Sequence, residues 1–392
     1  MNKHSSSMAT PFWRDKRVIP FLLQAIFAIL VLLIGAFFFL NALDSMKQIG
    51  LSFGYDFLSK MASFDIGDKL IEFSSTDTYG KAFVVGILNT LRVAFIGIIL
   101  ATILGFIVGV ARLSNNWLAR SVATVYVEIF RNTPLLVQIF IWFYAVFLSF
   151  PTIEKSLNAL GLFFFSNRGT VIPWFEFTSS SFIWLISLFI GLILSVIIWK
   201  VKLSQQVETG KKKYPLFWSI GSVISLLIIA FFVTFETPLL FSIPEISGRG
   251  FVGGYTIGPG FCALLVALVM YTASYIAEIV RGGILAVSKG QVEAAKALGL
   301  KSSTILRLII LPQAIRVIIP PLTSQYLNLI KNSSLAAAVA YPEVFGVGIT
   351  ILSQTGKSVE VISIVILVYL SMSLLTSLLM NIFNKYSQLV ER

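Results

Sequence analysis

Residues 288–299 read SKGQVEAAKALG, and residues 309–312 read IILP. Ser288 and Gln291 have the S-x-x-Q spacing of a capping box, in which the two side chains satisfy free backbone amides at the start of a helix. The alanines that follow are strong helix formers. Gly299 suits the left-handed conformation that commonly ends a helix. This stretch therefore predicts a short helix that ends at a tight turn.

A second short helix is expected directly after the turn. Ser302 or Ser303 is placed to cap it, because serine is a preferred residue at a helix start. Pro312 is expected to interrupt it, because proline lacks the backbone donor that a helix interior needs. Together the two helices form a hairpin, which we call the elbow. One face has side chains small enough for a groove in another protein, and Glu293 offers a charge for pairing there.

On both sides of the elbow the chain is too apolar for a water-soluble protein. Of its 392 residues, 57% are hydrophobic and 12% are charged, whereas a soluble domain has about 25% charged residues. The mean hydropathy is +0.88. A surface of this composition must face lipid, so the sequence predicts an all-α integral membrane protein.

The membrane helices are expected where about 20 mostly apolar residues follow one another. We predict eight, and the first is expected to remain in the protein because it is too long for a signal peptide. The eight predicted spans are residues 18–41, 82–111, 121–149, 181–199, 217–235, 261–281, 317–340 and 359–383.

The basic residues predict the orientation of these helices. Lys and Arg gather in the N-terminal tail, in the loops after the second, fourth and sixth helices, and at the C-terminal end. Basic loops stay on the cytoplasmic side of a membrane. Both termini and the elbow are therefore expected in the cytoplasm. The net charge of +12 is explained by this asymmetry, and no nucleic-acid partner is expected.

The residue inventory excludes several kinds of catalytic and metal site. The one histidine is His4, in the polar tail, and the one cysteine is Cys262, in an apolar run. Histidine-based metal clusters and Ser-His-Asp or Cys-His catalytic sets are thereby excluded. We expect no metal site and no enzymatic activity in this chain.

Three stretches are expected outside the membrane on the far side from the elbow. Residues 42–80 mix apolar and acidic residues and are predicted to be partly helical. Residues 150–180 carry aromatic residues that suit the headgroup boundary. Residues 236–260 are rich in Gly and Pro, which is typical of a loop.

The elbow carries a recognisable set of residues at fixed spacing: Glu293, Ala294, Ala295, Gly299, Ile309, Leu311 and Pro312. This set resembles the EAA loop of bacterial ABC importer permeases. The resemblance implies that the elbow, residues 286–312, docks as a coupling helix into a cleft of a cytoplasmic ATPase. It also implies that the elbow passes the motion of the ATPase to the membrane helices.

Three further stretches are similar to signatures of the polar amino-acid (histidine, glutamine and glutamate) branch of that family. They read EIFRNTPLLVQ at 128–138, EIVRGG at 278–283 and LIKNSSL at 329–335. The resemblance implies the five-helix core of a type I ABC importer, in two parts at residues 81–150 and 256–385. Residues 1–80 would add a cytoplasmic tail, an extra helix and a periplasmic segment, and residues 151–255 would be an insertion. This layout is most similar to permease subunits of the general L-amino-acid transport system.

The resemblance also implies partners and a location. The chain would lie in the bacterial inner membrane, beside a second, different permease chain. It would work with an ABC ATPase dimer and a periplasmic amino-acid-binding protein. No G-x-x-x-x-G-K-[ST] motif is present, because Ile351 stands where the first glycine before Gly356-Lys357-Ser358 should be. ATP and Mg²⁺ are therefore expected in the partner, and this chain is expected to hold no cofactor.

Charged residues in predicted membrane helices are functional candidates, because charge in a bilayer is costly. Glu128 and Arg131 are three residues apart on one helix face, so they can pair. They are candidates for contacting a zwitterionic substrate or coupling gate motion, or else for a structural ion pair that braces the bundle. Glu278 and Arg281 repeat this spacing near the cytoplasmic end, and are candidates for gating or for a structural pair. Arg92 is expected to extend toward the membrane surface or, alternatively, to contact substrate.

The polar run Lys331-Asn332-Ser333 lies about 15 residues beyond Arg316, roughly 22 Å along a helix. Consecutive polar residues at that depth need a wet cavity or a broken helix. We hypothesise that Lys331 and nearby donors receive the carboxylate of an amino acid, while Glu128 receives its ammonium group.

The small residues Gly97, Ala101, Gly105 and Gly109 recur at every fourth position of the second predicted helix. They allow another helix to approach closely, as ordinary packing or as a joint between moving helices.

Two other classes of function remain as alternatives. An ion-coupled secondary transporter or channel is compatible with eight helices, although internal repeats, which are usual in such transporters, are not found. A membrane enzyme would need a nucleophile and base, which the sequence does not offer.

Overall fold

The computed structural model describes residues 19–48, 53–248 and 250–387. Seven of the described helices are long and apolar enough to cross a membrane, and a bent pair makes an eighth. This confirms the prediction of about eight membrane helices. The expectation that both termini are cytoplasmic concerns ends that lie outside the described residues. The seven helices that contain the long spans are α1 (Ile19–Gln48), α2 (Tyr79–Ala111), α5 (Ser181–Thr209), α6 (Pro215–Thr234), α7 (Pro259–Leu285), α10 (Leu311–Asn332) and α12 (Ser358–Ser387).

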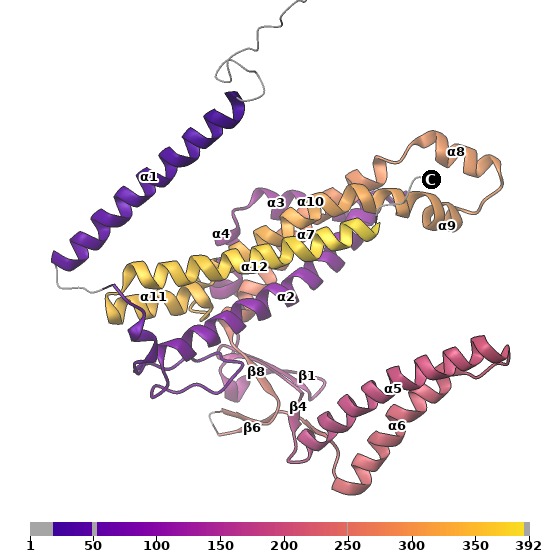
Figure 1. The fold of residues 1–392 in the computed structure, drawn as a ribbon, viewed down its shortest axis with the longest axis horizontal. Coiled ribbons are helices and arrows are strands. Elements are labelled where there is room, and N and C mark those ends of the chain that lie inside the picture. Colours follow the sequence, from indigo (N-terminus) through magenta and orange to yellow (C-terminus); the bar gives the residue numbers. More distant parts are fainter. Residues whose placement is uncertain (1–18, 49–52, 249, 388–392) are drawn as a thin grey trace, which may run out of the picture.

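The packed bundle is built around α2 and α7 (Figure 1), whose contact depends on small residues. A Cβ atom at Gly105 would lie 2.6 Å from Ile276, and one at Gly109 would lie 2.7 Å from the carbonyl oxygen of Ala277. Larger side chains at these positions would therefore push the two helices apart. The small-residue stripe of α2 is a close helix contact, as the spacing predicts.

α10, α11 and α12 complete the bundle around this pair. The short helix α11 (Val344–Thr355) was not anticipated from the sequence. It begins at Glu343, whose carboxylate accepts hydrogen bonds from the backbone amides of Phe345 and Gly346 and from the hydroxyl of Tyr369. An acidic side chain at this position satisfies amides that have no partner within the helix.

The predicted span 121–149 is bent rather than straight. The structure has α3 (Trp117–Asn132), then α4 (Leu135–Phe140), which continues into the π-helix η3 (Ile141–Phe147). The direction of the helix changes by 105° between the two arms. Pro134 explains the break, because proline disfavours the helical conformation in the residue before it, here Thr133.

The expectation that Pro312 interrupts a helix is wrong. α9 (Ser302–Ile305), the π-helix η5 (Leu306–Ile310) and α10 follow one another without a gap, and residues 302–339 count as one span. Pro312 lies in the first turn of α10. The π-helix directly before it interrupts the regular α-helical hydrogen-bond pattern, which is compatible with a residue that has no backbone donor.

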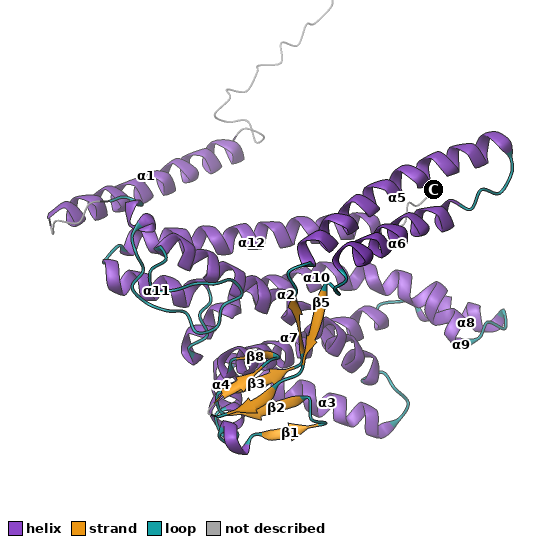
Figure 2. Cartoon of the chain, turned by 90° about the horizontal axis from the view of Figure 1, so that it is seen from below, coloured by secondary structure: helices purple, strands orange, loops and turns teal. Residues whose placement is uncertain are grey.

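The stretches expected as outer loops contain short strands as well as loops (Figure 2). The strands are β1 (Leu157–Ala159), β2 (Phe163–Ser166), β3 (Gly169–Ile172), β4 (Trp174–Phe177), β5 (Leu239–Ser242), β6 (Glu245–Ser247), β7 (Gly250–Val252) and β8 (Tyr255–Ile257). β1, β2, β3 and β8 form an antiparallel sheet in that order, and β4 pairs with β5. The short helices η2 (Asp56–Ser59) and η4 (Ile153–Lys155) precede them. Aromatic and β-branched residues favour these strands.

The strands form the base of the insertion. β3 pairs with β8, with Val171 opposite Thr256. In the sequence, β4, α5, α6 and β5 all come between these two paired strands. The insertion therefore begins and ends at two neighbouring strands of one sheet. α5 and α6 pack on each other and lie away from the bundle in Figure 1.

Candidate functional site

The elbow is formed by α8 (Lys289–Ala297), the turn at Gly299, and α9. Gly299 has φ of +76°, so the predicted left-handed conformation is confirmed. The amide of Gly299 donates to the carbonyl oxygen of Lys296 (2.9 Å), and the amide of Leu300 donates to that of Ala295 (3.2 Å). These two bonds make a Schellman motif, which satisfies the last carbonyls of α8.

The predicted caps at the starts of the two elbow helices do not form. α8 begins after Ser288 as expected, but the Ser288 side chain accepts no capping hydrogen bond. Gln291 instead contacts the side-chain amide of Gln313 in α10. Lys301, rather than either serine, occupies the cap position of α9. A bond between Gln291 and Gln313 ties α8 to the membrane helix that follows the elbow.

The outer surface of the elbow is open. Glu293 is exposed and, within the described residues, makes no hydrogen bond or ion pair. Ala294 is also exposed, whereas Ala295 is 3% exposed and packs inward. Leu298, which the sequence analysis did not select, is 80% exposed beside Gly299. The signal that could have found it is an apolar residue at the tip of a polar hairpin. The tip of the elbow thus presents one apolar and one acidic side chain to its surroundings.

The remaining predicted elbow residues lie at its base. Ile309, Leu311 and Pro312 are half-buried where η5 runs into α10. α8 contacts α9 and η5, and Figure 1 shows α8 and α9 extending beyond the end of the bundle. The residues that resemble the family motif therefore divide into an exposed tip and an anchored base.

Glu278 and Arg281 form the expected pair, and Arg112 joins them. The Arg281 guanidinium approaches Glu278 Oε1 at 2.5 Å, and Arg112 pairs with Glu278 Oε2. Arg112 caps the C-terminal end of α2. One carboxylate thus links α2 to α7, a few residues before the elbow.

Glu128 and Arg131 do not pair with each other, so the alternative of a structural ion pair between them is wrong. Glu128 Oε2 accepts a hydrogen bond from the side chain of Asn132 (3.0 Å). The Arg131 guanidinium lies 5.4 Å from the ring centre of Tyr275 in α7. The Asn132 amide therefore stabilises the charge of Glu128, and the Tyr275 ring stabilises that of Arg131. Both side chains are exposed on α3.

The helix changes geometry at the polar run in α10, which agrees with the broken helix that was one of the two expected alternatives. The α-helix ends at Asn332, and Ser333–Val339 form the 3₁₀-helix η6. Ser333 is fully buried, and its hydroxyl donates to the carbonyl oxygen of Ile330 (2.7 Å). Lys331 is exposed and Asn332 is half-buried. Within the described residues, Lys331 makes no ion pair and does not contact Glu128.

Arg92 reaches Asp68 in the segment before α2, which was expected outside the membrane. Its guanidinium pairs with Asp68 Oδ1 at 2.9 Å, and the two side chains are only 9% and 13% exposed. The guanidinium also lies 4.0 Å from the ring centre of Phe261 and 5.3 Å from that of Tyr255. Ion pairing and cation–π contacts stabilise this buried charge.

Asn89 joins three segments next to this ion pair. Its side-chain amide donates to the carbonyl oxygens of Asp68 (2.7 Å) and Pro342 (2.9 Å). The backbone carbonyl oxygen of Asn89 accepts a hydrogen bond from the hydroxyl of Tyr341 (3.1 Å). A cavity of about 840 Å³ opens here, lined in part by Asp68, Tyr255 and Tyr341. It lies at the end of α7 opposite the elbow.

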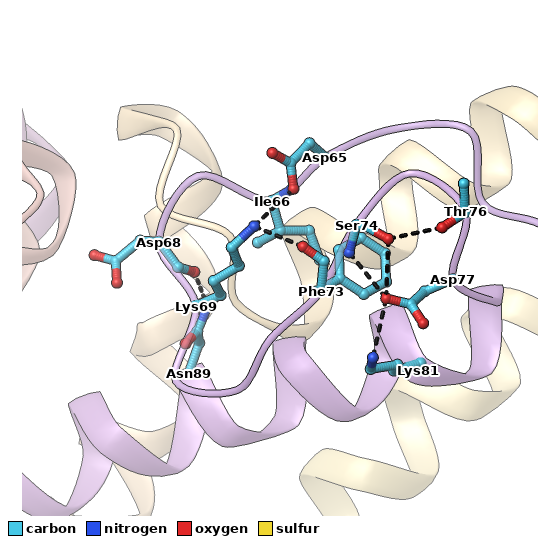
Figure 3. A network of polar contacts seen from close by, with 10 residues as sticks. All are labelled: Asp65, Ile66, Asp68, Lys69, Phe73, Ser74, Thr76, Asp77, Lys81 and Asn89. Carbon is cyan, nitrogen blue, oxygen red and sulfur yellow. Dashed lines mark hydrogen bonds and ion pairs between the residues drawn. The ribbon is translucent and has the colours of Figure 1, made fainter. Parts of the chain in front are cut away.

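The segment before α2 is braced by further polar contacts (Figure 3). Lys69 contacts Asp65, and Lys81 contacts Asp77. The hydrogen bond from Lys69 lowers the pKa of Asp65 below its ordinary 3.8, and the bond from Lys81 does the same for Asp77. In Figure 3 the Asp68 carboxylate points away from these residues. The surface network and the buried pair are therefore separate.

The arrangement as a whole is that of a multi-helix membrane permease with a projecting elbow. Residues 214–388 match the family of binding-protein-dependent transport system inner membrane components. The chain is 42% identical over its full length to YhdX of Escherichia coli, covering 98% of that protein. It is 45% identical, over 93% of its length and 91% of the relative, to the general L-amino acid transport system permease protein AapQ of Rhizobium johnstonii.

A third relative extends the comparison. The glutamate/glutamine/aspartate/asparagine transport system permease protein BztB of Rhodobacter capsulatus is 40% identical, covering 94% of this chain and 93% of the relative. The chain belongs to the binding-protein-dependent ABC transporter permease family of the bacterial inner membrane. It is a multi-pass membrane protein and a transport subunit.

Proposed function

We propose that this permease imports L-amino acids delivered by a periplasmic amino-acid-binding protein. The names of its relatives, which are amino-acid, general L-amino-acid and glutamate/glutamine/aspartate/asparagine permeases, support this substrate class. A second permease chain, different but related, completes the translocation path. The large apolar surface left exposed on the bundle agrees with a membrane subunit that has both lipid and protein neighbours.

The elbow couples this chain to a separate ABC ATPase dimer, which binds ATP and Mg²⁺. The observation that carries this proposal is the exposed tip, where Glu293 and Leu298 project from a helix braced by Gly299. The apolar leucine would enter the groove of the ATPase, and the carboxylate would pair at its edge. The continuous helix from Ser302 would carry the motion into the membrane.

Substrate passes the polar groups of α10 and α3. Lys331, Asn332 and Ser333 lie where the α-helix changes to a 3₁₀-helix, and a lysine there can receive a carboxylate. Glu128 and Arg131 are exposed on α3 and offer charges of both signs to a zwitterion. Glu278 and Arg281, with Arg112, take part in gating, because Arg281 holds Glu278 within α7 while Arg112 links it to the end of α2.

Reconstitution of the complex into vesicles tests the coupling. Uptake of a labelled amino acid should require ATP hydrolysis and persist without an ion gradient. Glu293→Lys should reverse the docking charge, and Gly299→Val should strain the turn, because φ of +76° is unfavourable for a β-branched residue. Both variants should insert normally, bind the ATPase weakly and lose uptake.

Two matched variants serve as controls. Gly161→Val places the same strain at φ of +71°, but in the turn between β1 and β2, where open space also surrounds the residue. Glu208→Lys makes the same charge reversal on the exposed end of α5. Both should keep ATPase binding. Full ATPase association in both elbow variants, or uptake driven by an ion gradient alone, would contradict the proposal.

A further inference from the structure

The end of the α5–α6 hairpin where the two helices are connected carries an open groove of about 580 Å³. Its walls are apolar and aromatic, and the lining residues include Trp199, Tyr214, Phe217, Ile220, Gly221 and Ile224. These residues lie on both helices and on the turn between them. The groove is part of the insertion and lies away from the elbow and from the outer cavity.

The lengths of the helices place this groove at a membrane surface. α5 has 29 residues, about 43 Å of helix, whereas the hydrocarbon core is about 30 Å thick. Counted from Ser181 beside the outer strands, about 20 residues of helix cross the core and end near Trp199 and Lys200. Trp and Tyr favour this boundary. Figure 1 shows this end of the hairpin pointing toward the same end of the molecule as α8 and α9.

The groove runs from the headgroup level into the inner leaflet. It follows α6 from Tyr214 to Ile224, about 10 residues or roughly 15 Å, and it passes the level of Trp199 near Trp218 and Ser219. Open space surrounds Gly221, because a Cβ built there would meet no atom within 4 Å. Tyr214 adopts a left-handed backbone conformation, φ +47°, at the start of α6. This conformation is costly for a tyrosine and sets the ring at the mouth of the groove.

Five lysines lie at the same end of the hairpin: Lys200, Lys202, Lys211, Lys212 and Lys213. Among the described residues, none of them makes an ion pair with a carboxylate. Lys202 lies over the ring of Trp218, 5.0 Å from its centre. The acidic residue nearby, Glu208, accepts a hydrogen bond from Ser204. The positive charge at the mouth of the groove is therefore available to a ligand.

We propose that this groove binds an anionic phospholipid of the inner leaflet. One acyl chain lies along Phe217, Ile220 and Ile224, over Gly221, and the phosphate lies among the lysines. Charge complementarity and leaflet depth select this occupant over a protein helix, which would bury the lysines without a counter-charge. Basic loops on the cytoplasmic side follow from orientation alone, but orientation does not explain a preformed apolar groove beside them. The site adds a lipid ligand to the proposed transport function and does not depend on it.

Native mass spectrometry of the full-length chain tests the site. The purified protein is titrated separately with dioleoyl-phosphatidylglycerol and dioleoyl-phosphatidylcholine, and the first binding event is measured for each. Phosphatidylglycerol should bind at least tenfold tighter. The triple variant Lys211→Gln, Lys212→Gln, Lys213→Gln should lose this preference. Each lysine is expected to contribute about fivefold to the affinity for phosphatidylglycerol. Gly221→Phe should weaken the first binding of both lipids by filling the groove.

Matched variants separate the site from general effects. Lys289→Gln, Lys296→Gln, Lys301→Gln removes three exposed lysines from the elbow and should keep the preference. Ile229→Phe adds an aromatic ring at an exposed position two turns beyond Gly221 and should bind both lipids normally. Unchanged thermal midpoints show that each variant is folded.

Three results would overturn the inference. They are equal affinity of the wild type for both lipids, unchanged binding in Gly221→Phe, and equal loss of preference in the elbow triple variant. A photo-crosslinker at Ile224, used in native membranes, gives an independent answer. It should label phospholipid, and labelling of another transporter subunit instead would show that the groove is a protein interface.

Discussion

Gln138 in α4 donates its side-chain amide to the backbone carbonyl oxygen of Phe130 in α3, at 2.8 Å. The same amide donates to the carbonyl oxygen of Thr133, at 2.9 Å. Both carbonyls lie at the end of α3, where helix geometry provides no partner. Gln138 is 4% exposed, so water contributes little there. One side chain therefore holds the 105° bend between the two arms of the span.

Replacing Gln138 should loosen this bend. Gln138→Leu keeps the approximate volume but leaves two buried carbonyls without a donor, at a cost of about 1–3 kcal/mol each. We expect a lower midpoint of thermal unfolding in detergent and easier proteolysis near Pro134. Gln138→Glu, which also lacks the amide donor, should behave similarly. Val137→Ala, at an exposed neighbour, is the control. A wild-type midpoint in both Gln138 variants would show that the bend does not depend on this residue.

The buried Arg92–Asp68 pair should show strong coupling. Removing one partner leaves an uncompensated buried charge, which typically costs about 3–5 kcal/mol. Arg92→Met and Asp68→Asn should each lower stability markedly, and the double variant should lose much less than their sum. A double-mutant cycle measured by thermal or denaturant unfolding checks this.

The exposed pair Lys69–Asp65 provides the comparison. Its side chains are 32% and 65% exposed, so the same cycle should give little coupling. Additive single changes at Arg92 and Asp68 would contradict the buried pairing, whatever the result at the exposed pair.

Gly105 should be intolerant of any side chain. A Cβ there would approach Ile276 to 2.6 Å, so Gly105→Ala should separate α2 from α7 and cost about 1–3 kcal/mol. Gly282→Ala is the matched control, because its Cβ would meet no atom within 4 Å and alanine favours a helix. Thermal unfolding of the two variants should differ clearly. Equal midpoints would argue against close packing of the stripe.

Lys331 and Asn332 should affect substrate affinity if substrate passes them. Lys331→Ala should raise the KM of amino-acid uptake about tenfold or more, as expected for loss of a hydrogen bond from a charged group. Asn332→Ala should have a smaller effect in the same direction. Ser334→Ala, whose hydroxyl bonds only the local carbonyl of Lys331, is the control. Normal KM and rate in both Lys331 and Asn332 variants would remove them from the path.

The membrane spans could be predicted from the sequence because lipid contact dictates composition over about 20 residues at a time. The turn at Gly299 was predictable because few residues adopt a positive φ without strain. The pair Glu278–Arg281 was predictable because three residues along a helix bring side chains together. Each of these predictions depends on local spacing.

The misses depend on which of several possible partners a side chain takes, and on exposure, neither of which spacing decides. Asp68 reaches Arg92 from a loop, so helix periodicity could not reveal it. Glu128 turns to Asn132, and Arg131 turns to a ring of α7, although the spacing allowed them to pair. β3 finds β8 only after the whole α5–α6 insertion. Leu298 needed the structure to show that it is exposed.

The hydrogen bonds of Asn89 have a consequence for the mobility of the outer cavity wall. A single buried amide ties the segment before α2 to the chain at Pro342, and Arg92 fastens the same segment through Asp68. That segment cannot move away from α2 without breaking both bonds to Asp68 together. In this structure, that wall of the outer cavity is therefore rigidly anchored to α2, so a change in cavity shape would have to come from movement of whole helices.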